Sequence, residues 1–285
     1  MTAIALPRRR YSAWRDKLRS IQLGLGARGA AAGLGLGRSQ VTGASNGLLN
    51  NLVAYWKLDE AGGANDALDA HSNGLTLTQV SSPGADTGKV YSTARAFDGS
   101  ADWFSRAADS SLQTGDIDFT IACWVFLTKT NTEHVVYSRW DVSSLREYFI
   151  SWVQSTNQFR FIVSATGSSP YSNVSASTFG AISSATWYFI VAQHDAANNL
   201  IGISVNDTAT DTSAHTTGVY TGSSKTTIGT YNISGSGFGP ASWGGRIGPV
   251  AFWKSAAGGG GVLTAAQRTA LYNGGAGLPY SQFTT

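Results

Sequence analysis

The sequence has little cysteine, little charge and no long apolar run. One cysteine among 285 residues excludes an intramolecular disulfide framework and a zinc site built from several cysteines. Cys123 stands in the apolar segment "IACWVF" and is expected to be a buried thiol. Because no stretch of about 18 apolar residues occurs, we expect no membrane-spanning helix. The basic N-terminus is not followed by the apolar block of a secretory signal peptide.

Charged residues make up only 13% of the chain, and they are unevenly distributed. Residues 1–50 hold eight basic groups and one acidic group, Asp16, whereas the remaining residues hold 12 basic and 16 acidic groups. The net charge of +3 therefore combines +7 in the N-terminal segment with −4 in the rest. A mildly acidic body is poorly suited to nucleic acid, and we expect no nucleic-acid partner for it.

Turn-forming and aromatic residues are abundant, with 34 Gly, 9 Trp, 11 Tyr and 12 Phe. In "IDFTIACWVFL", residues 117–127, alternating apolar side chains share one strand face: Ile117, Phe119, Ile121, Cys123, Val125 and Leu127. Residues 158–163, 187–191 and 201–205 alternate in the same way, and clusters of Gly, Ser, Asn and Asp separate these segments. Many short strands with almost no helix predict an all-β antiparallel sandwich.

One helix is expected near the end of the chain, at about residues 265–273. Thr264 and Gln267 have the spacing of a capping box, and Gly274 is suited to end the helix. Leu271 and Tyr272 are expected to hold this helix against the sandwich.

Six segments occur in an order that is typical of one family. They are "LVAYWKLDEAGG" (52–63), "DAHSNGLTL" (69–77), "RAFDGS" (95–100), "FTIACW" (119–124), "ATWYFIVAQHD" (185–195) and "GGRIGPVAFW" (244–253). Together they resemble the laminin-G-like, concanavalin-A-like jelly rolls over about residues 50–280. The resemblance implies a two-sheet antiparallel jelly roll with a short C-terminal helix. We expect this domain at residues 50–285, preceded by an arm of residues 1–49.

Two positions depart from the family pattern. Gly248-Pro249 stands where the closing strand usually has Asp, and because Pro cannot donate to a ladder we expect an edge strand or a bulge there. Asn206-Asp207 replaces the family's Tyr-x-Asp-Gly hairpin, and both residues are suited to positive φ.

The resemblance also implies glycan binding, which needs aromatic rings beside amide and carboxylate groups. The candidate ligand-binding residues near predicted loops are Trp103, Trp140, Tyr231 and Trp243, with Tyr171 as a further aromatic. The segment "SRWD", with Arg139, Trp140 and Asp141, is the most binding-like cluster.

Calcium is the one cofactor that the resemblance suggests, and no other is expected. Asp69, Asn73 and Asp98 match family positions where acidic oxygens occur, and calcium prefers oxygen ligands. The alternative is that these side chains stabilise turns by bonding to their own backbone.

Glycoside hydrolysis would need two carboxylates at a defined separation, which alternate positions on one strand can supply. The chain has three glutamates, Glu60, Glu133 and Glu147, and none has an acidic residue two or four positions later. Asp116 and Asp118 have this spacing, but their position at a strand entrance is typical of a turn. We therefore expect that the protein is not an enzyme.

The segment of residues 1–49 is predicted to be a docking arm, with a short helix at about residues 12–22 and an extended Gly-rich part after it. Its apolar residues are the expected assembly anchor: Trp14, Leu18, Ile21, Leu23, Leu25, Leu34 and Leu36. Gly between the leucines permits close backbone approach to a partner subunit. The alternative is a disordered tail.

These features favour a structural and recognition protein, with a jelly-roll head displayed on a large assembly such as a phage virion. The expected partners are other protein subunits, in a homo-oligomer, and a surface glycan. A secreted or surface-bound bacterial carbohydrate-binding module is the alternative, and a glycoside hydrolase is the third hypothesis.

Overall fold

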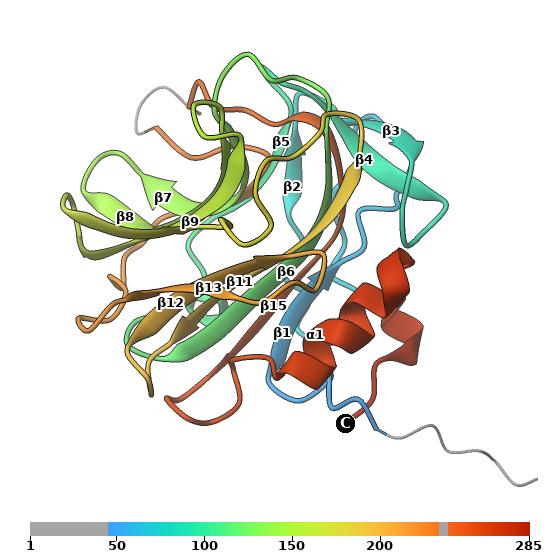
Figure 1. Ribbon diagram of the computed structural model, residues 1–285. Coiled ribbons are helices and arrows are strands. Elements are labelled where there is room, and N and C mark those ends of the chain that lie inside the picture. Colours follow the sequence, from blue (N-terminus) through green and yellow to red (C-terminus); the bar gives the residue numbers. More distant parts are fainter. Residues whose placement is uncertain (1–44, 234–238) are drawn as a thin grey trace, which may run out of the picture. The chain divides into compact units, whose positions relative to one another are not determined.

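The computed structural model describes residues 45–233 and 239–285. The predicted helix at about residues 12–22 and all seven anchor residues of the arm lie outside the described residues. The described residues belong to one compact unit, a sandwich of two antiparallel sheets (Figure 1). The predicted all-β, two-sheet jelly roll is thereby confirmed.

The first sheet has eight strands. Its order is β13 (Asp211–Ala214), β12 (Leu200–Val205), β11 (Trp187–Asp195), β6 (Asp118–Leu127), β15 (Gly244–Ser255), β4 (Thr93–Asp98) and β3 (Gly84–Thr87), and β1 (Leu52–Trp56) also pairs with β15. The second sheet has seven strands, in the order β10 (Tyr171–Ser175), β9 (Gln158–Gly167), β8 (Leu145–Val153), β7 (His134–Asp141), β14 (Thr226–Ile228), β5 (Trp103–Arg106) and β2 (Thr78–Val80).

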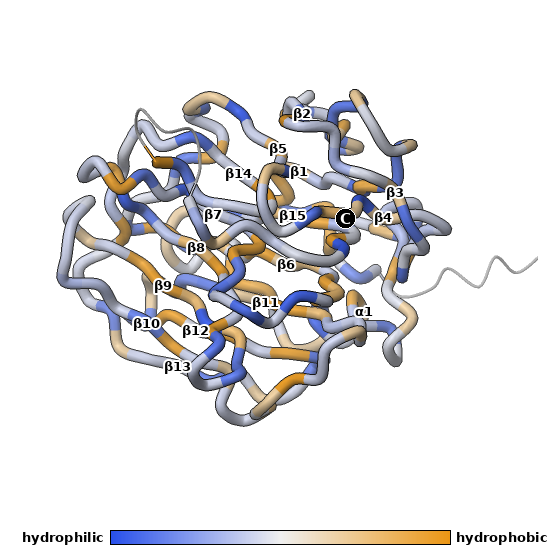
Figure 2. The backbone as a smooth tube through the Cα atoms, turned by 90° about the horizontal axis from the view of Figure 1, so that it is seen from above, coloured by the Kyte–Doolittle hydropathy of each residue, from blue (hydrophilic) through white to orange (hydrophobic). Residues whose placement is uncertain are grey.

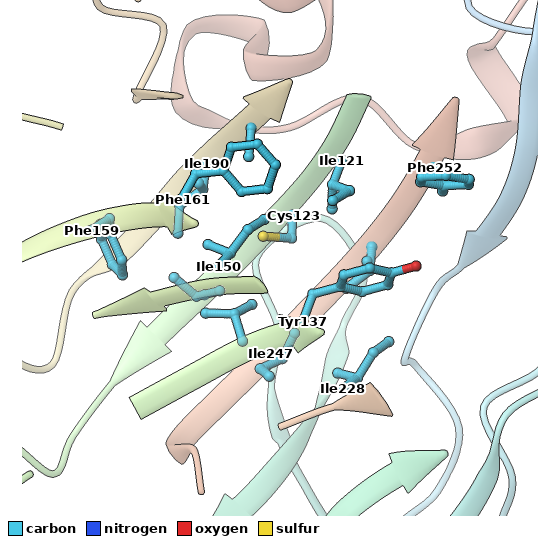
Figure 3. Packing of buried hydrophobic residues seen from close by; sticks show 14 of the residues in the cluster. Ile121, Cys123, Tyr137, Ile150, Phe159, Phe161, Ile190, Ile228, Ile247 and Phe252 are labelled. Carbon is cyan, nitrogen blue, oxygen red and sulfur yellow. The ribbon is translucent and has the colours of Figure 1, made fainter. Parts of the chain in front are cut away.

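The two sheets enclose the main core, as the alternating pattern predicted. Phe119, Ile121, Cys123, Val125 and Leu127 of β6 are all buried in it. Figure 3 shows Ile121 and Cys123 there, together with side chains of β8, β9 and β15. Hydrophobic and hydrophilic residues follow one another closely along the strands (Figure 2). Ile117, which the pattern placed on the same face, precedes β6 and is only half-buried.

A second apolar layer covers the outer side of the eight-stranded sheet. It includes side chains of the helix α1 (Ala265–Tyr272) and of the short helical turn η3 (Tyr280–Gln282); another short turn, η2 (Asn273–Gly275), directly follows α1. A further turn, η1 (Ser110–Leu112), connects β5 and β6. The ring of Tyr272 stacks on Trp124 of β6 at 5.9 Å between centroids, and Leu271 is buried, so the predicted docking of the helix is confirmed.

The turn chemistry follows the sequence closely. The capping box of Thr264 and Gln267 is present, and the helix ends one residue earlier than predicted because Asn273 adopts the left-handed conformation at its end. Asn206 and Asp207 both have positive φ, at 51° and 61°. The register shift between Ile247 and Val250 is the bulge expected at Gly248-Pro249, although β15 lies in the middle of its sheet and is not an edge strand.

Residues 45–49, which the sequence placed in the arm, belong to the sandwich unit instead. Leu48 is fully buried, and its carbonyl accepts a hydrogen bond from the Trp253 indole at 2.8 Å. The Leu49 amide donates to the Thr284 carbonyl at 2.9 Å, so both ends of this unit lie together near α1 (Figure 1). No helix among the described residues has the length and apolarity to cross a membrane.

Candidate functional site

The outer side of β7, β8, β9 and β10 carries a cluster of rings that is separate from the main core. Phe149 of β8 pairs with Ile162 of β9, which pairs with Asn173 of β10. Because neighbouring residues on a strand point to opposite faces, Tyr148 and Ile150 enter the core while Phe149 points outward. We call this outer cluster the aromatic face; it consists of Trp140, Phe149, Ile162, Tyr171 and Tyr231.

The rings of the aromatic face pack against one another. Trp140 lies 4.8 Å from Phe149, edge to face, and 4.9 Å from Tyr171, measured between ring centroids. Tyr231 stacks against Phe149 at 6.4 Å. Tyr171 is 36% exposed, whereas Trp140 is 6% exposed. The ring of Tyr171 is therefore accessible to a ligand, whereas the ring of Trp140 is buried and packs against it.

Arg146 lies beside these rings at the start of β8. Its guanidinium carbon is 5.8 Å from the centroid of Tyr171 and 6.0 Å from that of Trp140, within the range of a cation–π contact. Its side chain is half-buried. The aromatic face thus combines an accessible ring with a cation at its edge.

Further polar groups line the same side of the sheet. Glu133 accepts hydrogen bonds from Arg160 at 2.6 Å and from the Ser151 hydroxyl at 2.7 Å. Burial and the charge of Glu133 raise the pKa of the Tyr231 hydroxyl, so this group is a hydrogen-bond donor at neutral pH. Asn173 is exposed on β10. Hydroxyl, amide and carboxylate groups therefore surround the rings.

The structure brings together only part of the predicted ligand-binding set. Trp140 and Tyr231 lie in the aromatic face, with Tyr171. Trp243 is fully buried in the main core, and its indole donates to the Arg246 carbonyl at 3.2 Å, so it offers no surface to a ligand. Trp103 is buried on β5, outside this cluster.

The "SRWD" segment does not act as one cluster, because its residues alternate across the sheet. Arg139 points into the sandwich and forms a bidentate ion pair with Glu147, at 2.9 and 3.0 Å. Both side chains are fully buried, and burial raises the pKa of Glu147 to about 7. Asp141 accepts from the Ser143 amide at 2.9 Å and from the Asn232 side chain. Only Trp140 of this segment belongs to the aromatic face.

The residues suggested for calcium do not fit an ion as a set. Asp69 accepts hydrogen bonds from the amides of Tyr55, His71 and Leu75 at 2.9–3.0 Å. Asp98 accepts from the amides of residues 100–102 and from the Ser100 hydroxyl. Asn73 donates to the Val53 carbonyl at 2.8 Å. Across residues 45–233 and 239–285, no group of three or more His, Cys, Asp or Glu side chains is placed to hold a metal.

Sequence comparison decides the family of this fold. The laminin G family model, described as the concanavalin A-like lectin/glucanases superfamily, matches residues 97–259, which is more than half of the chain. The chain belongs to the concanavalin A-like lectin/glucanase superfamily. None of the curated proteins matches the sequence.

Solved structures share the superfamily fold at low identity. Domain 4 of AbnA, a GH43 extracellular arabinanase from Geobacillus stearothermophilus in complex with arabinotriose, is 19% identical with a TM-score of 0.55, over 77% of this chain and 97% of that one. The binding domain of Paraclostridial Mosquitocidal Protein 1 is 15% identical with a TM-score of 0.59, over 78% of this chain and 52% of that one. Trypanosoma rangeli sialidase in complex with sialic acid is 14% identical with a TM-score of 0.56, over 80% and 34%. At these identities the likeness establishes the lectin/glucanase-like jelly roll alone.

Proposed function

We propose that the protein is a non-catalytic glycan-binding head that holds sugar rings on the aromatic face. The observation that carries this proposal is the accessible ring of Tyr171. The buried ring of Trp140 packs against it, with 4.9 Å between the centroids, and the guanidinium of Arg146 lies beside it. Because another ring already packs against Tyr171, its side chain loses little conformational freedom when a ligand binds. The apolar face of a sugar can pack on such a ring. The surrounding hydroxyl, amide and charged groups can bond to sugar hydroxyls.

The fold neighbours agree with this proposal at the level of ligand class. The arabinanase domain was solved with arabinotriose and the sialidase with sialic acid, and both ligands are carbohydrates. The chain spans about half of the mosquitocidal binding domain and about a third of the sialidase, so the activities of those whole proteins are not carried over.

Display on a larger assembly is the second part of the proposal. Residues 45–49 lie near α1, whereas β7, β8 and β9 lie on the other side of the sandwich (Figure 1). An extension that starts at residue 45 therefore begins away from the aromatic face. The basic, Leu-containing segment before it supplies a means of docking to partner subunits of a homo-oligomer or of a virion.

Two alternative functions differ from this proposal, one in whether the protein assembles and the other in whether it is an enzyme. A secreted bacterial carbohydrate-binding module would use the same aromatic face but would not assemble. A glycoside hydrolase would need an accessible pair of carboxylates. Glu147 is fully buried in an ion pair with Arg139, and Glu133 forms an ion pair with Arg160. These contacts favour the non-catalytic proposal.

A glycan array tests the proposal with the full chain and the Tyr171→Ala variant. We expect the wild type to bind a defined set of glycans and Tyr171→Ala to lose about tenfold or more in affinity. Trp187→Ala, which removes a half-buried ring on the opposite sheet, is the matched control and should bind as the wild type does. An array without signal, or equal binding by Tyr171→Ala, would contradict the proposal.

A further inference from the structure

Arg146 differs from every other arginine in the part of the chain that the structure describes. Each of the others has a hydrogen bond to a carboxylate or to a backbone carbonyl: Arg95, Arg106, Arg139, Arg160, Arg246 and Arg268. Arg146 has only its contacts with the rings of Trp140 and Tyr171. Its five N–H donors therefore have no acceptor among the described residues.

A comparison within the molecule shows that stacking does not require this isolation. Arg246 also lies over two rings, 3.7 Å from Phe126 and 5.6 Å from Trp187, on the eight-stranded sheet. There the guanidinium also donates to the Thr87 carbonyl at 2.8 Å and forms an ion pair with Asp86 at 3.5 Å. Both arginines thus lie near two rings, Arg246 more closely than Arg146, but only Arg246 also has a carboxylate partner.

The carboxylates close to Arg146 in the sequence and on its sheet are already engaged. Glu147, its neighbour, points inward to Arg139. Asp141, across the β7–β8 hairpin, is bonded to Ser143 and Asn232. Glu133, on the same side of the sheet, is bonded to Arg160. Arg146 therefore has no carboxylate partner among the described residues, although the chain after residue 50 is acidic overall.

We infer that the aromatic face binds a sugar that carries a carboxylate, and that Arg146 recognises this carboxylate. The inference rests on the proposed function. The planar guanidinium can bind a carboxylate through two parallel N–H···O hydrogen bonds. Its contacts with the rings of Tyr171 and Trp140 restrict its orientation before a ligand binds. The Tyr171 ring beside it can cover the sugar that bears the carboxylate.

Calorimetric titration of the full chain with matched ligand pairs tests this inference. The pairs are 3′-sialyllactose with lactose, and trigalacturonate with its methyl ester, which removes the charge and keeps the sugar rings. We expect at least one acid to bind about 10- to 100-fold more tightly than its neutral partner. In Arg146→Gln the ratio of the affinities for the acid and for its neutral partner should fall to about one, whatever the affinity for the neutral partner becomes, and Arg146→Lys should restore only part of the preference.

Two control variants separate recognition from general charge. Arg246→Gln removes the stacked arginine of the opposite sheet, and Lys225→Gln removes an exposed positive charge outside the aromatic face. Both should retain the preference for the acid. Loss of the preference in either control, or equal binding of a sulfated lactose and of the carboxylated ligand, would overturn carboxylate recognition by Arg146.

The outcomes also separate this inference from the proposed function. Binding of neutral glycans that depends on Tyr171, without preference for the acid, would overturn the inference and leave the proposed function intact. No binding of any member of the pairs or of the array would overturn both.

Discussion

Arg139 and Glu147 face each other on β7 and β8 in the interior of the sandwich, joined by two hydrogen bonds of 2.9 and 3.0 Å. The guanidinium also donates to the Thr226 hydroxyl at 3.0 Å. Removing one partner of a fully buried pair leaves the other without compensation, whereas removing both does not. The pair lies directly behind the strand segments that carry Trp140 and Arg146.

Arg139→Leu should lower the free energy of unfolding by about 3–5 kcal/mol, because Glu147 then remains buried without a cation. The double variant Arg139→Leu/Glu147→Leu should recover a large part of this loss. Chemical denaturation of the wild type, both single variants and the double variant gives the coupling. A double variant that is less stable than either single variant would contradict this account.

The pH dependence of stability should reflect the buried carboxyl. Burial raises the pKa of Glu147 from 4.5 to about 7, so between these values the folded protein binds more protons at this site than the unfolded chain. The contribution of this group to stability is therefore full below about pH 4.5 and is lost as the pH rises through about 7.

Glu147→Gln has no titrating group at this position. The difference between the wild type and this variant therefore isolates the contribution of the Glu147 carboxyl to the pH dependence. The stability of the wild type relative to Glu147→Gln should be greatest at the low end of this range and should decrease toward pH 8, as measured by urea unfolding at each pH. A relative stability that increases with pH would mean that Arg139 dominates and lowers the pKa.

Calcium should not change the thermal stability, because the oxygens of Asp69 and Asp98 already accept backbone amides. Differential scanning calorimetry with excess calcium and with a chelator should give the same Tm. Asp69→Ala should lower the free energy of unfolding by about 1–3 kcal/mol in both conditions, since it leaves buried amides unpaired. A Tm that rises with calcium only in the wild type would restore the calcium hypothesis.

Much of the fold could be predicted from the sequence because its determinants are local. The period of two in residues 117–127 placed the β6 side chains in the core, and the capping box of Thr264 and Gln267 marked the start of α1. The turn at Asn206 and Asp207 and the bulge before Val250 followed from residue chemistry alone. That β15 lies in the middle of its sheet depends on pairings between distant strands, which no local pattern encodes.

The candidate site could be predicted only in part, for the same reason. Trp140 and Tyr171 are 31 positions apart, and the pairings of β8 and β9 between them bring their rings together. Sequence reasoning grouped Arg139 with Trp140, although consecutive residues on a strand point to opposite faces. It missed Phe149, whose outward position follows from the alternation within residues 145–153.

The arm should be dispensable for folding and required for assembly. A deletion of residues 1–43 is preferable to one that ends at residue 49, because Leu48 is buried in the sandwich. The deletion variant should retain the cooperative unfolding and the glycan binding of the full chain, and it should no longer co-sediment with the assembly. Full incorporation of the deletion variant would contradict the docking proposal.

Chemical-shift mapping shows whether glycans bind on the aromatic face. The ¹⁵N-labelled protein is titrated with the glycan that gives the strongest array signal. We expect saturable shifts of the Trp140 indole, the Arg146 side chain and the amides of β8 and β10, with the indoles of Trp187 and Trp253 unchanged. Saturable shifts confined to other parts of the sandwich, with the Trp140 and Arg146 signals unmoved, would contradict this expectation.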